Sequence, residues 1–165
     1  MKFSIEHTFQ GVSLPDYEKL YFDEAFQLAI CEAVKLKRTV LKVDRTESHI
    51  NRHVRVEPSR EIPAPIAKVL GGEGFHYVEE LEYDLGKYRG RWRIVSGMLP
   101  DKVSVSGTLE LALTSSGVKR TVAGEIKVSV FGIGGIIEKF VVTDIEKGYA
   151  DAAAFTVKWL QQRGR

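Results

Sequence analysis

The chain has 165 residues, of which 44% are hydrophobic and 28% charged, so it is long and apolar enough to bury a core. A formal net charge of only +2 argues against nucleic acid as the main partner. One cysteine, Cys31, excludes an intrachain disulfide. With a charged N-terminus and no long apolar run, these features predict a cytoplasmic protein that forms a single domain over residues 1–165.

The first third of the chain predicts one strand and two short helices. Residues 3–9 alternate between apolar and polar side chains, which is typical of a half-buried strand and places His7 on the apolar face. Ser13 and Asp23 then stand where they can cap two short helices.

The middle of the chain predicts six strands joined mostly by short turns. A segment with three prolines, residues 58–74, interrupts them and predicts an irregular connection with one short helical turn. One-sided strands in close succession predict an antiparallel sheet with one solvated face. The expected strands cover about 37–47, 49–57, 75–85, 92–98, 103–113 and 122–130.

The last third predicts a tight turn and one long helix. Residues 131–135 hold three glycines, and an amphipathic pattern follows as far as Gln161. Gly148 lies inside that pattern and indicates a bend or a close approach to another element. A capping-box pattern at 143–146 leaves a break open as an alternative, but the continuous apolar stripe favours one helix. The whole order predicts an α+β fold in which a sheet of seven strands curls around the final helix.

This order of elements, together with three stretches of sequence, resembles the START-like, or helix-grip (SRPBCC), superfamily. The stretches are Phe3–His7, Ala67–Gly72 and Val128–Lys139, and an uncharacterised bacterial START-like family is the closer match. The superfamily includes the birch-pollen allergen family, polyketide cyclases and lipid-transfer domains. The resemblance implies a helix-grip fold with a cavity for a hydrophobic ligand, and it brings no catalytic residues with it.

No motif in the sequence indicates a metal or cofactor site. The glycines that precede the long helix lack the lysine and the spacing of a phosphate-binding loop. His49 and His53 share a strand face, but four residues of strand separate them by about 13 Å, too far for one ion. We therefore expect neither a metal nor a cofactor.

Three polar residues stand on faces that are otherwise apolar: His7, Arg52 and Glu79. An unpaired buried charge is costly, so Arg52 and Glu79 are expected to pair if their strands adjoin. Structural pairing is the simpler interpretation. The alternative is that the three side chains orient the polar end of a ligand inside an apolar cavity.

Apolar residues of the sheet and of the last helix are the candidates for the wall of such a cavity. Small residues at 150 and 152–154 of the helix, with Gly107 and Gly124 in the strands, favour an open space above about 200 Å³ over a filled core. The candidate wall residues are Phe75, Tyr77, Trp92, Ile94, Met98, Leu109, Leu111, Phe140 and Ile145.

The function predicted from these features is non-catalytic binding or transport of a hydrophobic small molecule or lipid. One alternative is a cyclase- or hydrolase-type enzyme that uses the same cavity, with His7 and Glu79 as its acid or base. Another is an interaction module with a filled core. For the basic and aromatic segment Lys87–Arg93, a solvated strand face is the simpler interpretation. Transient contact with an anionic membrane surface is the alternative, and it is favoured over nucleic acid at this low net charge.

Overall fold

A computed structural model of the chain describes residues 1–59, 61–70, 76–96 and 99–164. The strands in these residues are β1 (Lys2–Phe9), β2 (Leu36–Arg45), β3 (His49–Pro58), β4 (Tyr77–Asp84), β5 (Arg89–Ser96), β6 (Val103–Thr114) and β7 (Gly117–Val128). The helices are α1 (Leu14–Tyr21), α2 (Glu24–Ala33), α3 (Ala64–Leu70) and α4 (Gly134–Arg163).

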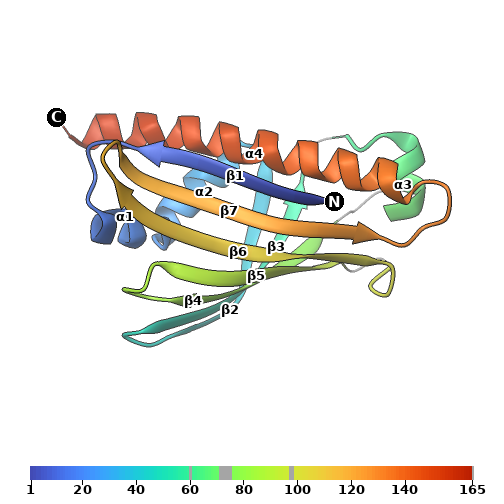
Figure 1. Ribbon diagram of the computed structural model, residues 1–165, viewed down its shortest axis with the longest axis horizontal. Helices are drawn as coiled ribbons and strands as arrows, with labels where there is room; N and C mark the ends of the chain where they lie inside the picture. Colours follow the sequence, from blue (N-terminus) through green and yellow to red (C-terminus); the bar gives the residue numbers. More distant parts are fainter. Residues whose placement is uncertain (60, 71–75, 97–98, 165) are drawn as a thin grey trace.

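The strands form one antiparallel sheet that curves around α4 (Figure 1). Their order across the sheet is β1-β7-β6-β5-β4-β3-β2, so strands β2 to β7 each lie beside their neighbour in sequence, and β1 pairs with β7. The predicted α+β helix-grip fold is confirmed: a seven-stranded curved antiparallel sheet, a long C-terminal helix, and two short helices after the first strand.

Both predicted caps of the short helices are present. The Ser13 hydroxyl accepts a hydrogen bond from the backbone N–H of Asp16 at 3.2 Å, and the Asp23 carboxylate accepts one from Phe26 at 2.8 Å. Each bond satisfies a backbone donor that the first turn of a helix leaves unpaired. The caps fix where α1 and α2 begin, and these helices cover the end of the sheet opposite α3 (Figure 1).

Alternation along the strands separates a buried face from a wet one, as the sequence predicts. In β3, Ile50, Arg52 and Val54 are buried, whereas the intervening residues are only half-buried. β3 pairs with β4 so that Val54 lies opposite Glu79. This register puts Arg52 and Glu79 on the same inward face, one diagonal step apart.

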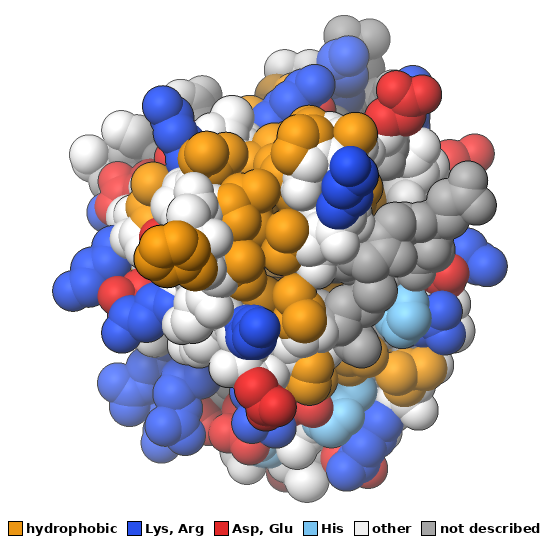
Figure 2. All heavy atoms as spheres, turned by 90° about the vertical axis from the view of Figure 1, so that its right-hand side faces the viewer, with side chains coloured by type: hydrophobic (Ala, Val, Ile, Leu, Met, Phe, Trp, Pro, Cys, Tyr) orange, Lys and Arg blue, Asp and Glu red, His pale blue; other side chains and the backbone are white. Residues whose placement is uncertain are grey.

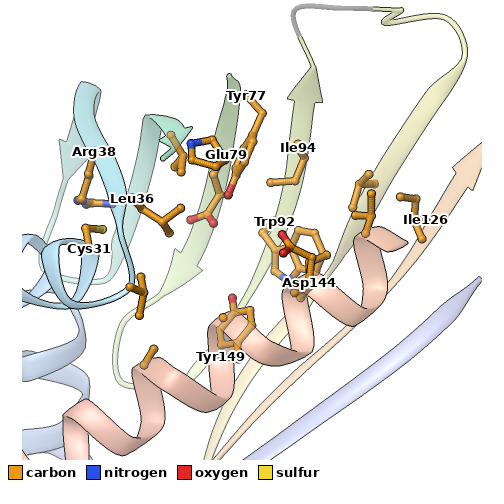
Figure 3. A pocket seen from close by; sticks show the side chains of 18 of the residues that line it. Cys31, Leu36, Arg38, Tyr77, Glu79, Trp92, Ile94, Ile126, Asp144 and Tyr149 are labelled. Atoms are coloured by element: carbon orange, nitrogen blue, oxygen red, sulfur yellow. The ribbon is translucent and has the colours of Figure 1, made fainter. Parts of the chain in front are cut away.

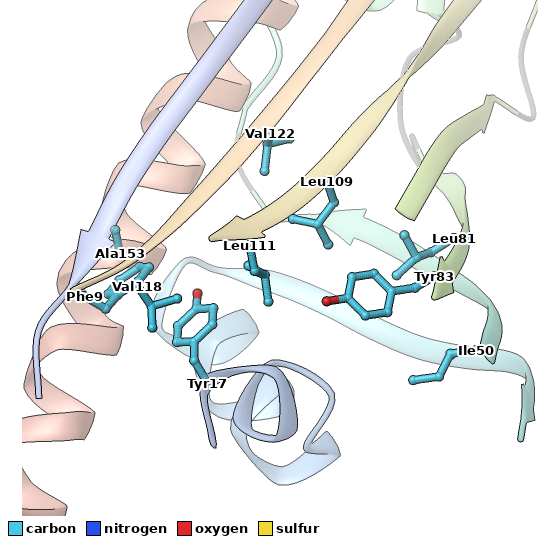
Figure 4. Close-up of a cluster of buried hydrophobic side chains, with 10 residues drawn as sticks. All are labelled: Phe9, Tyr17, Ile50, Leu81, Tyr83, Leu109, Leu111, Val118, Val122 and Ala153. Carbon is cyan, nitrogen blue, oxygen red and sulfur yellow. The ribbon is translucent and has the colours of Figure 1, made fainter. Parts of the chain in front are cut away.

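Apolar side chains fill the space between the sheet and the helices in two clusters. The first packs under α1 and contains Phe9, Tyr17, Ile50, Leu81, Tyr83, Leu109, Leu111, Val118, Val122 and Ala153 (Figure 4). The second lies under the first half of α4 and contains Phe3, Ile5, Ile66, Val105, Ile126, Val128, Ile137 and Val142. α3 contributes Ile66 to this second cluster, so α3 closes the other end of the molecule.

The glycine-rich turn between β7 and α4 lets the chain leave the strand and start the helix in a tight space, as predicted. Gly132 has a φ of +78°, a conformation that favours glycine. A Cβ on Gly134 would lie 2.3 Å from the carbonyl oxygen of Val128, so only glycine permits α4 to start against the end of β7. Glu138 then accepts a hydrogen bond from the backbone N–H of Val128 at 2.8 Å and ties the helix to the strand.

The last helix is continuous from Gly134 to Arg163, as the apolar stripe predicted, and the break left open as an alternative at the capping-box pattern does not occur. The interpretation of Gly148 as a close approach to another element was wrong. A Cβ on Gly148 would meet no atom within 4 Å, because this side of α4 faces open space. Within the described residues, no helix is long and apolar enough to cross a membrane.

Candidate functional site

A pocket of about 290 Å³ lies between the inner face of the sheet, α2 and α4 (Figure 3). Its walls come from β2 to β7, from α4 between Ile137 and Ala152, from the end of α1, from α2 and the segment that follows it, and from residues between β3 and α3. It extends from Tyr21 and Arg120 at the α1 and α2 end to Ile62 and Ile137 at the α3 end. The pocket thus follows the axis of α4 along the hollow of the curved sheet.

One face of α4 supplies the helical wall. Spacings of three and four residues place side chains on the same face of a helix, so a stripe of this kind points in one direction. The stripe holds two predicted wall residues, Phe140 and Ile145. Its members are Ile137, Phe140, Val141, Asp144, Ile145, Gly148, Tyr149 and Ala152. Gly148 therefore leaves space on the pocket side of the helix, in the middle of its wall.

The sheet supplies the opposite wall. Tyr77 and Glu79 on β4 and Trp92 and Ile94 on β5 line the pocket, all predicted site residues. Figure 3 shows these four side chains on the sheet side, with Tyr149 projecting from α4 across from them.

The two strand glycines make room for the Trp92 indole rather than for empty space. A Cβ on Gly107 or Gly124 would lie 2.6 or 2.8 Å from Cζ2 of Trp92. The two glycines are paired in register on β6 and β7, and Trp92 lies opposite Gly107. The interpretation of these glycines as thinning the sheet around a cavity is corrected: they seat a pocket-lining tryptophan.

Three predicted site residues, Leu109, Leu111 and His7, lie outside the pocket, and two more cannot be placed. Leu109 and Leu111 are 2% and 5% exposed and belong to the cluster under α1 (Figure 4), because α1 packs over that part of β6. His7 is half-buried on β1 and contacts a pocket residue rather than the pocket. Phe75 and Met98 lie outside the described residues.

The predicted pairing of Arg52 with Glu79 is confirmed. An Nη of Arg52 lies 3.6 Å from a carboxylate oxygen of Glu79, and both side chains line the pocket. The Arg52 guanidinium also stacks over the Phe22 ring at 5.5 Å, while its Nε has no hydrogen-bond acceptor among the described residues. The pair thus places two matched charges on the sheet wall of the pocket.

A second inward arginine, Arg120 on β7, escaped the sequence interpretation. It is 3% exposed and lines the pocket. Its guanidinium donates to the Tyr17 hydroxyl at 3.3 Å and lies 3.5 Å from Nδ1 of His7. Arg120 alternates with Val118 and Val122 along the strand, and this pattern alone would have placed it on the inner face.

The groups around Arg120 are held neutral. Burial raises the pKa of Tyr17 to about 12, against the opposing effect of the Arg120 charge. Burial, with a further contribution from Arg120, lowers the pKa of His7 below 6.5. Burial also raises the pKa of the phenols of Tyr21 and Tyr149, which line the same end of the pocket.

α2 and the edge strand close the remaining side, also with residues that the sequence interpretation did not select. Cys31 faces the pocket, and burial raises the pKa of its thiol. Arg38 lines the pocket as well, and its guanidinium binds both carboxylate oxygens of Glu24 at 3.0 Å. The apolar stripe of α2 marks the helix as buried, but the pattern alone does not reveal which sheet face it covers.

The basic segment Lys87–Arg93 lies at the opposite end of the molecule from α3 (Figure 1). Arg91 pairs with Glu82 at 3.6 Å, and Arg93 pairs with Glu80. Two of its positive charges thus already have carboxylate partners on β4. Across residues 1–59, 61–70, 76–96 and 99–164, no group of three or more His, Cys, Asp or Glu residues is placed to hold a metal ion.

Comparisons with known proteins identify a family for this chain and solved structures with a similar fold. The family model described as a protein of unknown function, DUF2505, matches residues 4–160. No curated protein matches the chain. TTHA0849 of Thermus thermophilus has a similar structure, with a TM-score of 0.69 at 13% identity over 100% of both chains.

Two further solved structures are similar. The Zhui aromatase/cyclase of a Streptomyces species has a TM-score of 0.66 at 11% identity, covering 100% of this chain and 97% of its own. Ms6760 of Mycobacterium smegmatis has a TM-score of 0.61 at 11% identity, covering 98% of this chain and 92% of its own. At such identities the likeness shows the helix-grip fold alone.

Proposed function

Because this chain belongs to the family of proteins of unknown function DUF2505, we propose its function from its own pocket: it binds or carries a hydrophobic small molecule or lipid without catalysing a reaction on it. We also assign its fold to the START-like superfamily, since the sequence resemblance and the helix-grip architecture agree. The observation that carries the proposal is the 290 Å³ pocket with apolar walls on both the sheet and α4. Small-molecule sites are typically pockets of this kind, with a few polar groups that orient the ligand.

The polar groups of the pocket support binding rather than catalysis. Glu79, one of the two acid–base candidates, pairs with Arg52. His7, the other, lies beside Arg120 and does not line the pocket. A general acid or base has to reach the reacting group within hydrogen-bond distance, directly or through one water. His7 does not reach the pocket, and Glu79 reaches it as a carboxylate whose charge Arg52 matches.

The α3 end of the molecule offers an apolar approach to the pocket. Phe131 in the turn before α4 is fully exposed, and Ile136 in the first turn of α4 is 64% exposed. Figure 2 shows this end of the molecule, where hydrophobic side chains gather across the surface. Exposed apolar patches mark contact sites for partners, membranes or ligands. We therefore assign ligand entry to this end, near Ile62 and Ile137.

The test is binding of the neutral apolar fluorophore N-phenyl-naphthylamine, followed by its emission. The wild-type chain is expected to bind it saturably. Gly148→Leu places a side chain in the open space beside α4, and we expect it to weaken binding by about tenfold or more. Ala150→Leu is the matched control: it lies on the same helix, two residues from Gly148, and it is exposed and outside the pocket.

The proposal is wrong if the wild-type chain does not bind the fluorophore, or if Gly148→Leu binds it as tightly as Ala150→Leu does. Circular dichroism spectra of both variants serve to check that each keeps the fold. Turnover is tested separately, by recovering the bound molecule unchanged after incubation.

A further inference from the structure

Arg120 carries a buried positive charge that has no carboxylate partner among the described residues. The other arginines that line the pocket have one: Arg38 binds Glu24, and Arg52 binds Glu79. Arg120 contacts only neutral groups, the phenol of Tyr17 and the imidazole of His7, at 3.3 and 3.5 Å. Its Nε has no acceptor in the described part of the chain.

The compensation that Arg120 does receive comes from aromatic rings. Its guanidinium carbon lies 5.3 Å from the centre of the Phe9 ring and 5.2 Å from that of Tyr149. Such contacts are weaker than a paired carboxylate, and an arginine stays protonated in proteins. The α1 end of the pocket therefore carries a fixed positive charge without a countercharge among the described residues, on a side chain that is only 3% exposed.

Two further donors converge on this end. The phenols of Tyr21 and Tyr149 line the pocket beside Arg120, and both stay protonated because burial raises their pKa. A protonated phenol can donate a hydrogen bond to an anion. The nearest acidic residue on the same helix face, Asp144, precedes Tyr149 by five residues, about 7.5 Å along the helix axis. Glu79 has its charge matched by Arg52.

We propose that the pocket selects an amphipathic monocarboxylate, with its carboxylate at Arg120 and its apolar tail extended along α4 toward Ile62 and Ile137. This inference rests on the proposed function and deepens it by naming the ligand class. A guanidinium matches a carboxylate with two parallel hydrogen bonds, which gives both charge balance and orientation. The remaining walls, Trp92 and Ile94 among them, present apolar surface to the tail.

The test compares three probes with the same chain and different head groups: decanoate, decanol and decyltrimethylammonium, each measured by displacement of N-phenyl-naphthylamine. Wild-type protein is expected to bind decanoate about tenfold or more tighter than decanol, and the ammonium more weakly still. Arg120→Gln should lose the preference for decanoate and keep its affinity for decanol. Arg93→Gln, which removes a positive charge on the outer face of β5, should keep the preference.

The two proposals fail in different ways. If decanol and decanoate bind equally well to the wild type, or if the preference survives in Arg120→Gln, the carboxylate site is wrong while the apolar pocket stands. If no probe and no fluorophore binds, the proposed function itself is wrong and the inference falls with it. The comparison of head groups uses the wild-type protein alone, so it can refute the inference even if Arg120→Gln fails to fold.

Discussion

The Arg52–Glu79 pair predicts an asymmetric loss of stability when either partner is removed. The Arg52 side chain is 7% exposed and the Glu79 side chain 30% exposed. Glu79→Leu strands a buried cation, which costs about 3 kcal/mol. Arg52→Met strands a carboxylate that water can still reach and keeps most of the apolar stem, so it should cost only about 1 kcal/mol.

The double variant completes the cycle. With both charges gone and two apolar side chains of similar length in their place, the total loss should fall to about 1 kcal/mol or less, giving a coupling energy of about 3 kcal/mol. Urea unfolding measures each value. With a slope of about 2 kcal/mol per molar urea, Glu79→Leu should lower the midpoint by about 1.5 M.

Glu80→Leu on the same strand is the matched control. Glu80 faces outward and pairs with Arg93, whose side chain is 67% exposed and can be hydrated when its partner is lost. This loss should stay below about 1 kcal/mol. A cost for Arg52→Met equal to or above that of Glu79→Leu would refute the reasoning that burial of the stranded charge sets the penalty.

Two further predictions concern His7 and the paired strand glycines. The folded chain holds the pKa of His7 below 6.5, so the stability that neutral His7 contributes is present above pH 6.5 and is lost as the pH falls through the lowered pKa. His7→Gln should therefore flatten the fall in urea midpoint between about pH 7.5 and about pH 5.5. An equally steep fall in the variant would contradict this role of His7. Gly124→Val should cost about 2 kcal/mol or more and shift the tryptophan emission, because its Cβ would lie 2.8 Å from Cζ2 of Trp92. An unshifted spectrum at wild-type stability would contradict the account of the paired glycines.

Periodicity predicts the elements well because burial here is one-sided. Strands β3 to β7 each place alternate residues on the inner face, and α4 carries a continuous apolar stripe, so patterns of two and of three to four residues are visible in the sequence. The pairing of Arg52 with Glu79 followed from the same reasoning, since a buried charge requires a partner.

Patterns fail where the outcome depends on which element covers a face. Leu109 shares its face of β6 with Val105, yet α1 covers the first and the pocket reaches the second. The sequence pattern around Gly148 is the same whether another element contacts this glycine or open space surrounds it. From the sequence, Gly107 predicts a thin part of the sheet beside a cavity, whereas in the structure the Trp92 indole lies against it. Such contacts join residues far apart in sequence, which local patterns do not encode.

Arg120 is a different case, because its signal was present. It stands between Val118 and Val122 in an alternating strand, so the period of two already places it inward. What the sequence could not reveal is that its neighbours are Tyr17 and His7 rather than a carboxylate. That identity of partners turns a buried arginine into a candidate anion site.

The most direct test of ligand binding in the pocket is a nitrogen–proton correlation spectrum of the two tryptophan indoles during titration with N-phenyl-naphthylamine. Trp92 lines the pocket, whereas Trp159 packs against Phe26, with ring centres 5.3 Å apart, and does not line it. A Trp159→Phe variant assigns the signals. The account predicts that the Trp92 indole signal moves in a saturable way while that of Trp159 stays in place. A titration that moves neither signal, or only that of Trp159, would contradict it.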